Sequence, residues 1–364
     1  MDRFSSKHFV FLMMAATVIS LKIYPLVYIK YSGRDSWVAL IAASALAAFY
    51  FMFAISTMKK ESLSLLVVYQ KAFGKYLGGV LLSFFALTIF LTLIESASLQ
   101  ADSMHQNMLV ETPNWYFLLF FIIPALYIVR KDLVAVVIII VIGVSLITIA
   151  GMHLGILTIQ QKSFSGLFPV FQQGITTGFF ISMLKCLGLY GCLSLTFPYL
   201  PYITYKREAL TKAVSIGLII IIEIEIVGVT GIFMTFSPND AVSYYYPKLI
   251  QTHLVSYFAM LEFGELYVML QTLGGFLMKY LLAFHALLQI MRSFKLKTRT
   301  IYISSFVMTG LVLAISMYVT LTSIRLFMVL EYLPWINLIN FVLIPTVAFI
   351  VYRNKQKKAL IPQA

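Results

Sequence analysis

Ten long apolar runs occupy most of this chain of 364 residues. A helix needs roughly 20 residues to cross a hydrocarbon core of about 30 Å. Only helices and closed barrels satisfy the backbone inside lipid, and these runs are too long and too uniformly apolar to be barrel strands. The sequence therefore predicts an all-α integral membrane protein with ten transmembrane helices. The predicted crossings lie at residues 9–29, 37–58, 77–102, 116–129, 133–155, 175–200, 209–236, 265–291, 300–321 and 327–352, of which the fourth is short enough to be tilted or joined to its neighbour.

The 27 lysine and arginine residues are distributed unevenly among the segments that connect these runs. Counted from the N-terminus, 19 of them fall in one alternate set of segments and five in the other. Because basic segments stay in the cytoplasm, this bias and the even number of crossings predict that both termini are cytoplasmic. The net charge of +13 is thus explained by topology and by contacts with membrane lipid head groups, and no nucleic-acid partner is expected.

The sequence offers little that is typical of an enzyme. It holds two cysteines, Cys186 and Cys192, six residues apart in the sixth run, where both are expected to pack as small apolar residues. No Walker motif, metal-ligand cluster or catalytic nucleophile arrangement is found, so no enzyme activity, metal or cofactor is expected. The first run is longer than a signal-peptide core and is expected to remain in the mature protein.

Two amphipathic stretches predict an internal repeat. Residues 62–73 and 247–261 mix apolar and polar faces at helical spacing and precede the third and eighth runs. They occupy corresponding places if the ten crossings divide into two sets of five. Because five is odd, the two halves would lie inverted in the membrane, as in many secondary transporters. We expect one transmembrane domain over 1–364, with repeats at about 8–155 and 175–352 and a basic cytoplasmic tail at 353–364.

Inverted-repeat transporters bind their ligands beside broken helices at the midplane. Proline and glycine favour such breaks because proline removes a backbone donor and glycine lowers the cost of leaving helical geometry. The first run carries Ser20, Lys22 and Pro25, and the sixth carries Gly188 and Gly191 before two prolines. We expect breaks in both crossings, the alternative being ordinary kinks.

Ionisable residues at membrane depth are costly and must face protein or water. Lys22 is the expected partner of Glu95, and one of Glu223 and Glu225, about 200° apart on a helix, is expected to meet Lys185 or Lys279. These groups form either a ligand or proton site or fixed ion pairs between helices. The ligand-binding candidates are Ser20, Leu21, Lys22, Tyr24, Glu95, Lys185, Gly188, Tyr190 and Gly191, and the proton or ion-pair candidates are Glu223, Glu225 and Lys279.

Short motifs spread along the chain resemble those of the B subunits of bacterial spore germinant receptors, a branch of the amino acid–polyamine–organocation transporter superfamily. The matching segments, in the family's order and spacing, are FGKYLG (73–78), ETP (111–113), GLFPVFQQG (166–174), YYPKLIQ (245–251) and LEFGE (261–265). The chain departs from the family where Lys22 falls inside the motif of the first crossing and where Tyr190 replaces an acid of the sixth.

The resemblance implies a five-plus-five inverted repeat of the LeuT type in the spore inner membrane. It also implies two partner subunits, A and C, and a small germinant, often an amino acid, bound between the first, third, sixth and eighth crossings. Two alternatives remain open: a proton-coupled amino-acid transporter, and a structural subunit whose pocket is plugged by Lys22 or Lys185.

Overall fold

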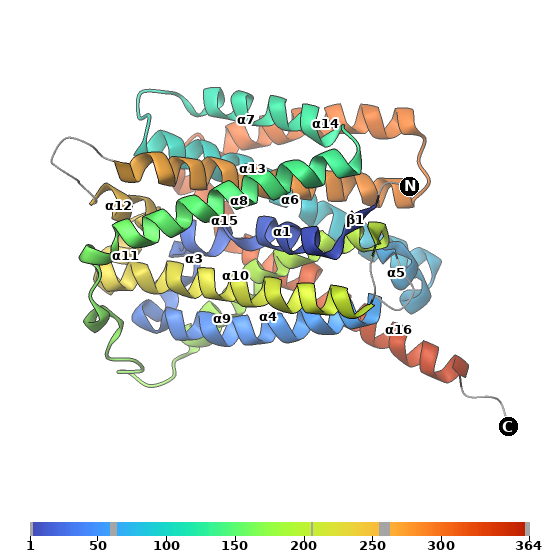
Figure 1. The fold of residues 1–364 in the computed structure, drawn as a ribbon, viewed down its shortest axis with the longest axis horizontal. Helices are drawn as coiled ribbons and strands as arrows, with labels where there is room; N and C mark the ends of the chain where they lie inside the picture. Colours follow the sequence, from blue (N-terminus) through green and yellow to red (C-terminus); the bar gives the residue numbers. More distant parts are fainter. Residues whose placement is uncertain (1–2, 59–63, 205–206, 255–262, 361–364) are drawn as a thin grey trace.

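The computed structural model describes residues 3–58, 64–204, 207–254 and 263–360 as a bundle of helices that run along one common axis (Figure 1). Nine helical stretches in these ranges are long and apolar enough to cross a membrane, and α7, with 16 residues, is a shorter apolar helix. The crossings in chain order are α1–α2–α3 (Ser6–Thr17, Ser20–Ile23, Leu26–Ser32), α4 (Ser36–Met58), α6 (Lys75–Asn107), α7 (Asn114–Val129), α8 (Leu133–Leu157), α9 with η4 (Thr177–Tyr190, Gly191–Tyr202), α10 (Arg207–Thr235), α13 (Phe263–Ser293), α14 (Thr298–Val319) and α15–η5–α16 (Ser323–Asn337, Leu338–Leu343, Ile344–Leu360). The predicted all-α membrane fold is confirmed.

The two amphipathic stretches predicted before the third and eighth crossings contain helices. In the first stretch α5 (Leu65–Phe73) is followed directly by α6, and in the second α12 (Pro247–His253) precedes α13. A further short helix, α11 (Pro238–Ser243), lies just before α12. The remainder of the second stretch and the first residues of the LEFGE motif lie in 255–262, outside the described residues.

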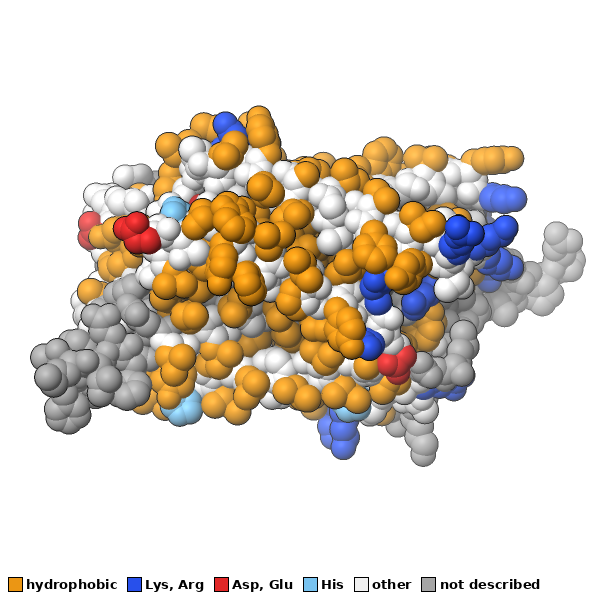
Figure 2. Space-filling view, turned by 90° about the horizontal axis from the view of Figure 1, so that it is seen from above, with side chains coloured by type: hydrophobic (Ala, Val, Ile, Leu, Met, Phe, Trp, Pro, Cys, Tyr) orange, Lys and Arg blue, Asp and Glu red, His pale blue; other side chains and the backbone are white. Residues whose placement is uncertain are grey.

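Both termini lie at the same end of the bundle, and α11 and α12 lie at the other (Figure 1). Near the terminal end, β1 (Phe4–Ser5) pairs in parallel with β2 (Ile203–Thr204), which links the start of the first crossing to the end of the sixth. Figure 2 shows lysine and arginine gathered toward the end that holds the termini, next to a broad apolar belt. Large apolar side chains of α7, such as Phe120 and Ile123, are 66% and 61% exposed, as expected of a lipid-facing surface.

The first crossing lies inside the bundle. Helix α1 packs against α8, α10 and α13 and against η4, and its residues Phe9, Leu12 and Met13 are completely buried. The third and eighth crossings, α6 and α13, pack along each other. These contacts place the first crossing next to the sixth and eighth, and the eighth next to the third, so the four crossings between which the sequence predicts a ligand site lie together.

Candidate functional site

The first crossing is broken at Pro25, as predicted. Helix α1 ends at Thr17, α2 covers only four residues, and α3 begins directly after the proline. Proline has no N–H, so the carbonyl of Leu21, four residues earlier, receives no helical hydrogen bond from it. The hydroxyl of Tyr28 donates to this carbonyl instead, at 2.7 Å. The side chain of a later residue thus stabilises the break.

Four buried side chains meet beside this break, and we call them the central cluster: Ser20, Tyr24, Glu95 and Lys279. The Nζ atom of Lys279 on α13 lies 2.7 and 2.8 Å from the two carboxylate oxygens of Glu95 on α6 and donates to the hydroxyl of Ser20 at 2.6 Å. The hydroxyl of Tyr24 donates to the same carboxylate. None of the four is more than 3% exposed. Because each charge has an opposite charge and further hydrogen bonds, the pair is stable away from water.

The sixth crossing changes from an α-helix to a 3₁₀ helix at Gly191, so the predicted break takes the form of a change in helix type. A Cβ atom on Gly188 would overlap the carbonyl oxygen of Pro334, and one on Gly191 would lie 3.3 Å from the carbonyl oxygen of Asn337. These two glycines therefore let the sixth crossing lie against the tenth. The hydroxyl of Tyr190 lies 2.8 Å from that of Ser44 on α4.

Lys185 belongs to a second polar group, toward the end of the bundle that holds α11 and α12. It forms an ion pair with Glu331 on α15 and donates to the carbonyl oxygen of the same residue at 3.1 Å. The hydroxyl of Tyr31 donates to the carboxylate, and the Nζ atom of Lys30 lies 2.7 Å from it. The expected pairing of Lys185 with a glutamate of the seventh crossing is therefore wrong.

Lys22 points away from the central cluster, toward α10. Its charge interacts with that of Glu225, whose side chain is fully buried. Neither carboxylate oxygen of Glu225 has a hydrogen-bond partner among the described residues. The expected pair of Lys22 with Glu95 is not formed, because Lys279 takes Glu95. Glu223, on the opposite side of α10, is exposed, as the 200° separation of the two glutamates predicts.

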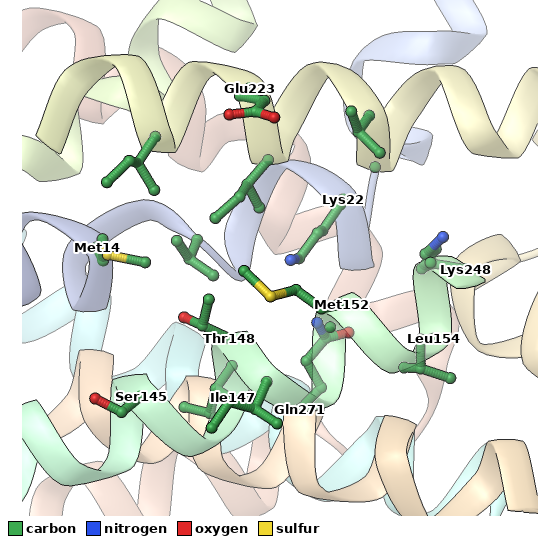
Figure 3. Close-up of a pocket in the computed structure, with 18 of the residues that line it drawn as sticks. Met14, Lys22, Ser145, Ile147, Thr148, Met152, Leu154, Glu223, Lys248 and Gln271 are labelled. Atoms are coloured by element: carbon green, nitrogen blue, oxygen red, sulfur yellow. The ribbon is translucent and has the colours of Figure 1, made fainter. Parts of the chain in front are cut away.

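A pocket of about 610 Å³ opens on this side of the first crossing, between α8 and α10 (Figure 3). Lys22 reaches into it from α2, and Lys162 and Lys248 line it at one end. The candidates chosen from the sequence thus fall in three places: the central cluster, the Lys185–Glu331 group, and this pocket.

Sequence reasoning missed the importance of Glu331, Lys162 and Lys248. Glu331 is an acid inside the last apolar run, and that position alone could have singled it out. Lys162 and Lys248 are in connecting segments, where a lysine is ordinarily solvated, so only the folded structure shows that they line a pocket.

The fold is that of membrane transporters. MhsT, solved in complex with L-phenylalanine, matches with a TM-score of 0.66 at 14% identity, over 96% of this chain and 89% of that one. A Na⁺-coupled sialic acid symporter matches with a TM-score of 0.65 at 11% identity, over 96% and 90%. The manganese transporter of Eremococcus coleocola matches with a TM-score of 0.66 at 14% identity, over 94% and 78%. At these identities the likeness shows the fold alone, which is the five-plus-five inverted repeat.

The family to which this chain belongs is a narrower group than the proteins that share this fold. Residues 4–325 match the family described as spore germination protein, and the chain belongs to that family. No curated protein matches the chain. Both the family and the fold are those of permeases.

Proposed function

We propose that this chain is the B subunit of a spore germinant receptor that senses a small, amino-acid-like nutrient at the central cluster. The observation that carries the proposal is the buried ion pair between Glu95 and Lys279. It lies between the third and eighth crossings, directly beside the break in the first. Family membership supports a role in germination, and the transporter fold supports a ligand site at this place.

The chemistry of the cluster favours a zwitterion. The ammonium group of an amino acid would pair with Glu95, and its carboxylate would pair with Lys279 and Ser20. One buried pair would then be replaced by two, and no charge would be left without a partner. A ligand carrying only an anion or only a cation would leave Glu95 or Lys279 unpaired, which is strongly unfavourable in a buried site.

Tyr24 connects the ligand site to the break in the first crossing, which is the segment that would move in such a receptor. Its hydroxyl donates to Glu95, and it lies at the turn between α2 and α3. A ligand that separates Glu95 from Lys279 would change this contact and thereby shift the packing of the first crossing against α6. In the proposed complex, subunits A and C read this shift in the spore inner membrane, with both termini of the chain in the cytoplasm.

Thermal-shift measurements on the purified protein, with amino acids, sugars and nucleosides, test the proposal. We expect an amino acid to raise the melting temperature of the wild type, and we expect Glu95→Gln and Lys279→Met to abolish the response. Lys185→Met is the matched control, since Lys185 is an equally buried, paired lysine outside the cluster. A response that survives both cluster variants would refute the site.

Glu225 favours a second candidate function, proton-coupled amino-acid transport. It is fully buried, and its carboxylate has no hydrogen-bond partner among the described residues, as suits a group that takes up and releases a proton. Uptake of a labelled amino acid into proteoliposomes under an imposed pH gradient tests this function. Accumulation that requires the gradient and is lost in Glu225→Gln would establish transport by the chain alone. Absence of uptake, together with ligand-induced stabilisation, would favour the receptor.

A further inference from the structure

The pocket between α8 and α10 opens sideways, toward the surface that faces lipid. At its mouth Ile149, Met152 and Val227 are 52%, 65% and 55% exposed. Its inner wall is formed by apolar side chains of the first crossing, among them Met14 of α1 (Figure 3) and Val18, which directly follows α1. Apolar walls with a few convergent polar groups are typical of a small-molecule site.

Three of the four charged residues that line this pocket are lysines, and two of them, Lys162 and Lys248, lie together near the end that holds α12. A Cβ atom on Gly231 would lie 3.7 Å from the Nζ atom of Lys248 and 3.8 Å from that of Lys162, so the two ammonium groups are neighbours. Their hydrogen-bond acceptors are neutral: Lys248 donates to the amide oxygen of Gln251 at 2.6 Å and Lys162 to the carbonyl oxygen of Gly155 at 3.4 Å. Among the described residues, neither lysine has a carboxylate partner.

Two neighbouring cations without an anionic partner repel each other, and here Lys248 is buried and Lys162 half-buried. Burial, together with the charges of Lys162 and Lys22, lowers the pKa of Lys248 to about 7. Burial also lowers the pKa of Lys162. Glu223, the carboxylate among the lining residues, precedes Gly231 by eight positions on α10, which is about 12 Å along the helix. Among the described residues, an anionic group next to Gly231 would therefore meet two cations and no carboxylate.

We propose that this pocket binds an anionic membrane lipid, with the phosphate of its head group between Lys162 and Lys248 and an acyl chain along the apolar walls. The open mouth lies on the lipid-facing flank, so a lipid reaches the site from the membrane. An acyl chain fills the apolar part of the cavity, which a small free anion would leave empty. This site lies on the opposite side of the first crossing from the central cluster and does not depend on the function proposed for it.

Thermal shifts in a neutral detergent test the proposal with three probes at matched concentrations: lysophosphatidylglycerol, lysophosphatidylcholine with the same chain, and inorganic phosphate. We expect the first to stabilise the protein and the other two to have little effect. Replacing both lysines, in Lys162→Gln/Lys248→Gln, should weaken the apparent affinity for lysophosphatidylglycerol by about tenfold or more, because two charge-assisted contacts are lost. Equal stabilisation by both lipids, equal stabilisation by phosphate alone, or an unchanged affinity in the double variant would overturn the proposal.

A pocket-filling variant separates lipid binding from any effect of the lysines on folding. No atom lies within 4 Å of a Cβ placed on Gly155, which lines the pocket, so Gly155→Leu fits the helix and occupies the cavity. Gly310 on α14 is equally open and lies away from the pocket, which makes Gly310→Leu the matched control. We expect Gly155→Leu to lose the response to lysophosphatidylglycerol and Gly310→Leu to keep it. A full response in a folded Gly155→Leu protein would contradict the site.

Discussion

Removing one partner of the Glu95–Lys279 pair should destabilise the protein far more than removing both. In Lys279→Met the hydroxyl of Tyr24 is the one partner that the carboxylate of Glu95 keeps within the described part of the chain, in a place where Glu95 is 3% exposed. Breaking a buried ion pair in this way costs about 3–5 kcal/mol. Glu95→Gln leaves the buried ammonium group without its carboxylate, with only neutral acceptors such as the hydroxyl of Ser20 and the glutamine oxygen, and should cost a similar amount.

The double variant Glu95→Gln/Lys279→Met leaves no buried charge at this place, since the glutamine oxygen can still accept from Tyr24. Its loss should therefore be clearly smaller than the sum of the two single losses, with a coupling energy above about 1 kcal/mol. Unfolding by sodium dodecyl sulfate in mixed micelles measures all four proteins under the same conditions. Additive losses would refute the ion pair as the centre of the site.

Three further predictions concern other parts of the chain. Gly188→Ala should destabilise the protein by about 1–3 kcal/mol, because the new Cβ atom would overlap the carbonyl oxygen of Pro334. Unfolding in mixed micelles measures this loss of stability, and a neutral effect would contradict the close approach of the sixth crossing to the tenth. Pro25→Ala restores an N–H for the carbonyl of Leu21, so hydrogen exchange at the break should slow; unchanged exchange would show that the proline does not maintain the break. Since the pKa of Lys248 is about 7 and a bound phosphate favours its charged form, affinity for lysophosphatidylglycerol should fall as pH rises from 6 to about 8.5, and this fall should be absent in a Lys248→Gln variant.

The membrane fold could be predicted because apolar length and charge distribution depend little on tertiary contacts. The break at Pro25 could be predicted from the chemistry of a single residue. The change from α-helix to 3₁₀ helix at Gly191 could be predicted from Gly188 and Gly191 and from the two prolines that follow them. The short motifs along the chain point to the family, and the match over residues 4–325 confirms this family resemblance.

The predicted pairs of Lys22 with Glu95 and of Lys185 with a glutamate of α10 are wrong because depth along a helix does not give the direction of a side chain. Ser20 and Tyr24 lie about 40° apart around a helix, whereas Lys22 lies about 200° from Ser20, so it points to the opposite side. The sequence contains this information. It does not contain the rotation and tilt of α13, which bring Lys279 to Glu95, nor the loop path that places Lys162 beside Lys248.

A structure of the protein with a stabilising amino acid bound tests the central claim most directly. We predict that the ligand lies between Glu95 and Lys279, with its ammonium group on the carboxylate, its carboxylate on the lysine, and the 2.7 Å contact between the two side chains broken. A ligand bound elsewhere while that contact persists would contradict the claim.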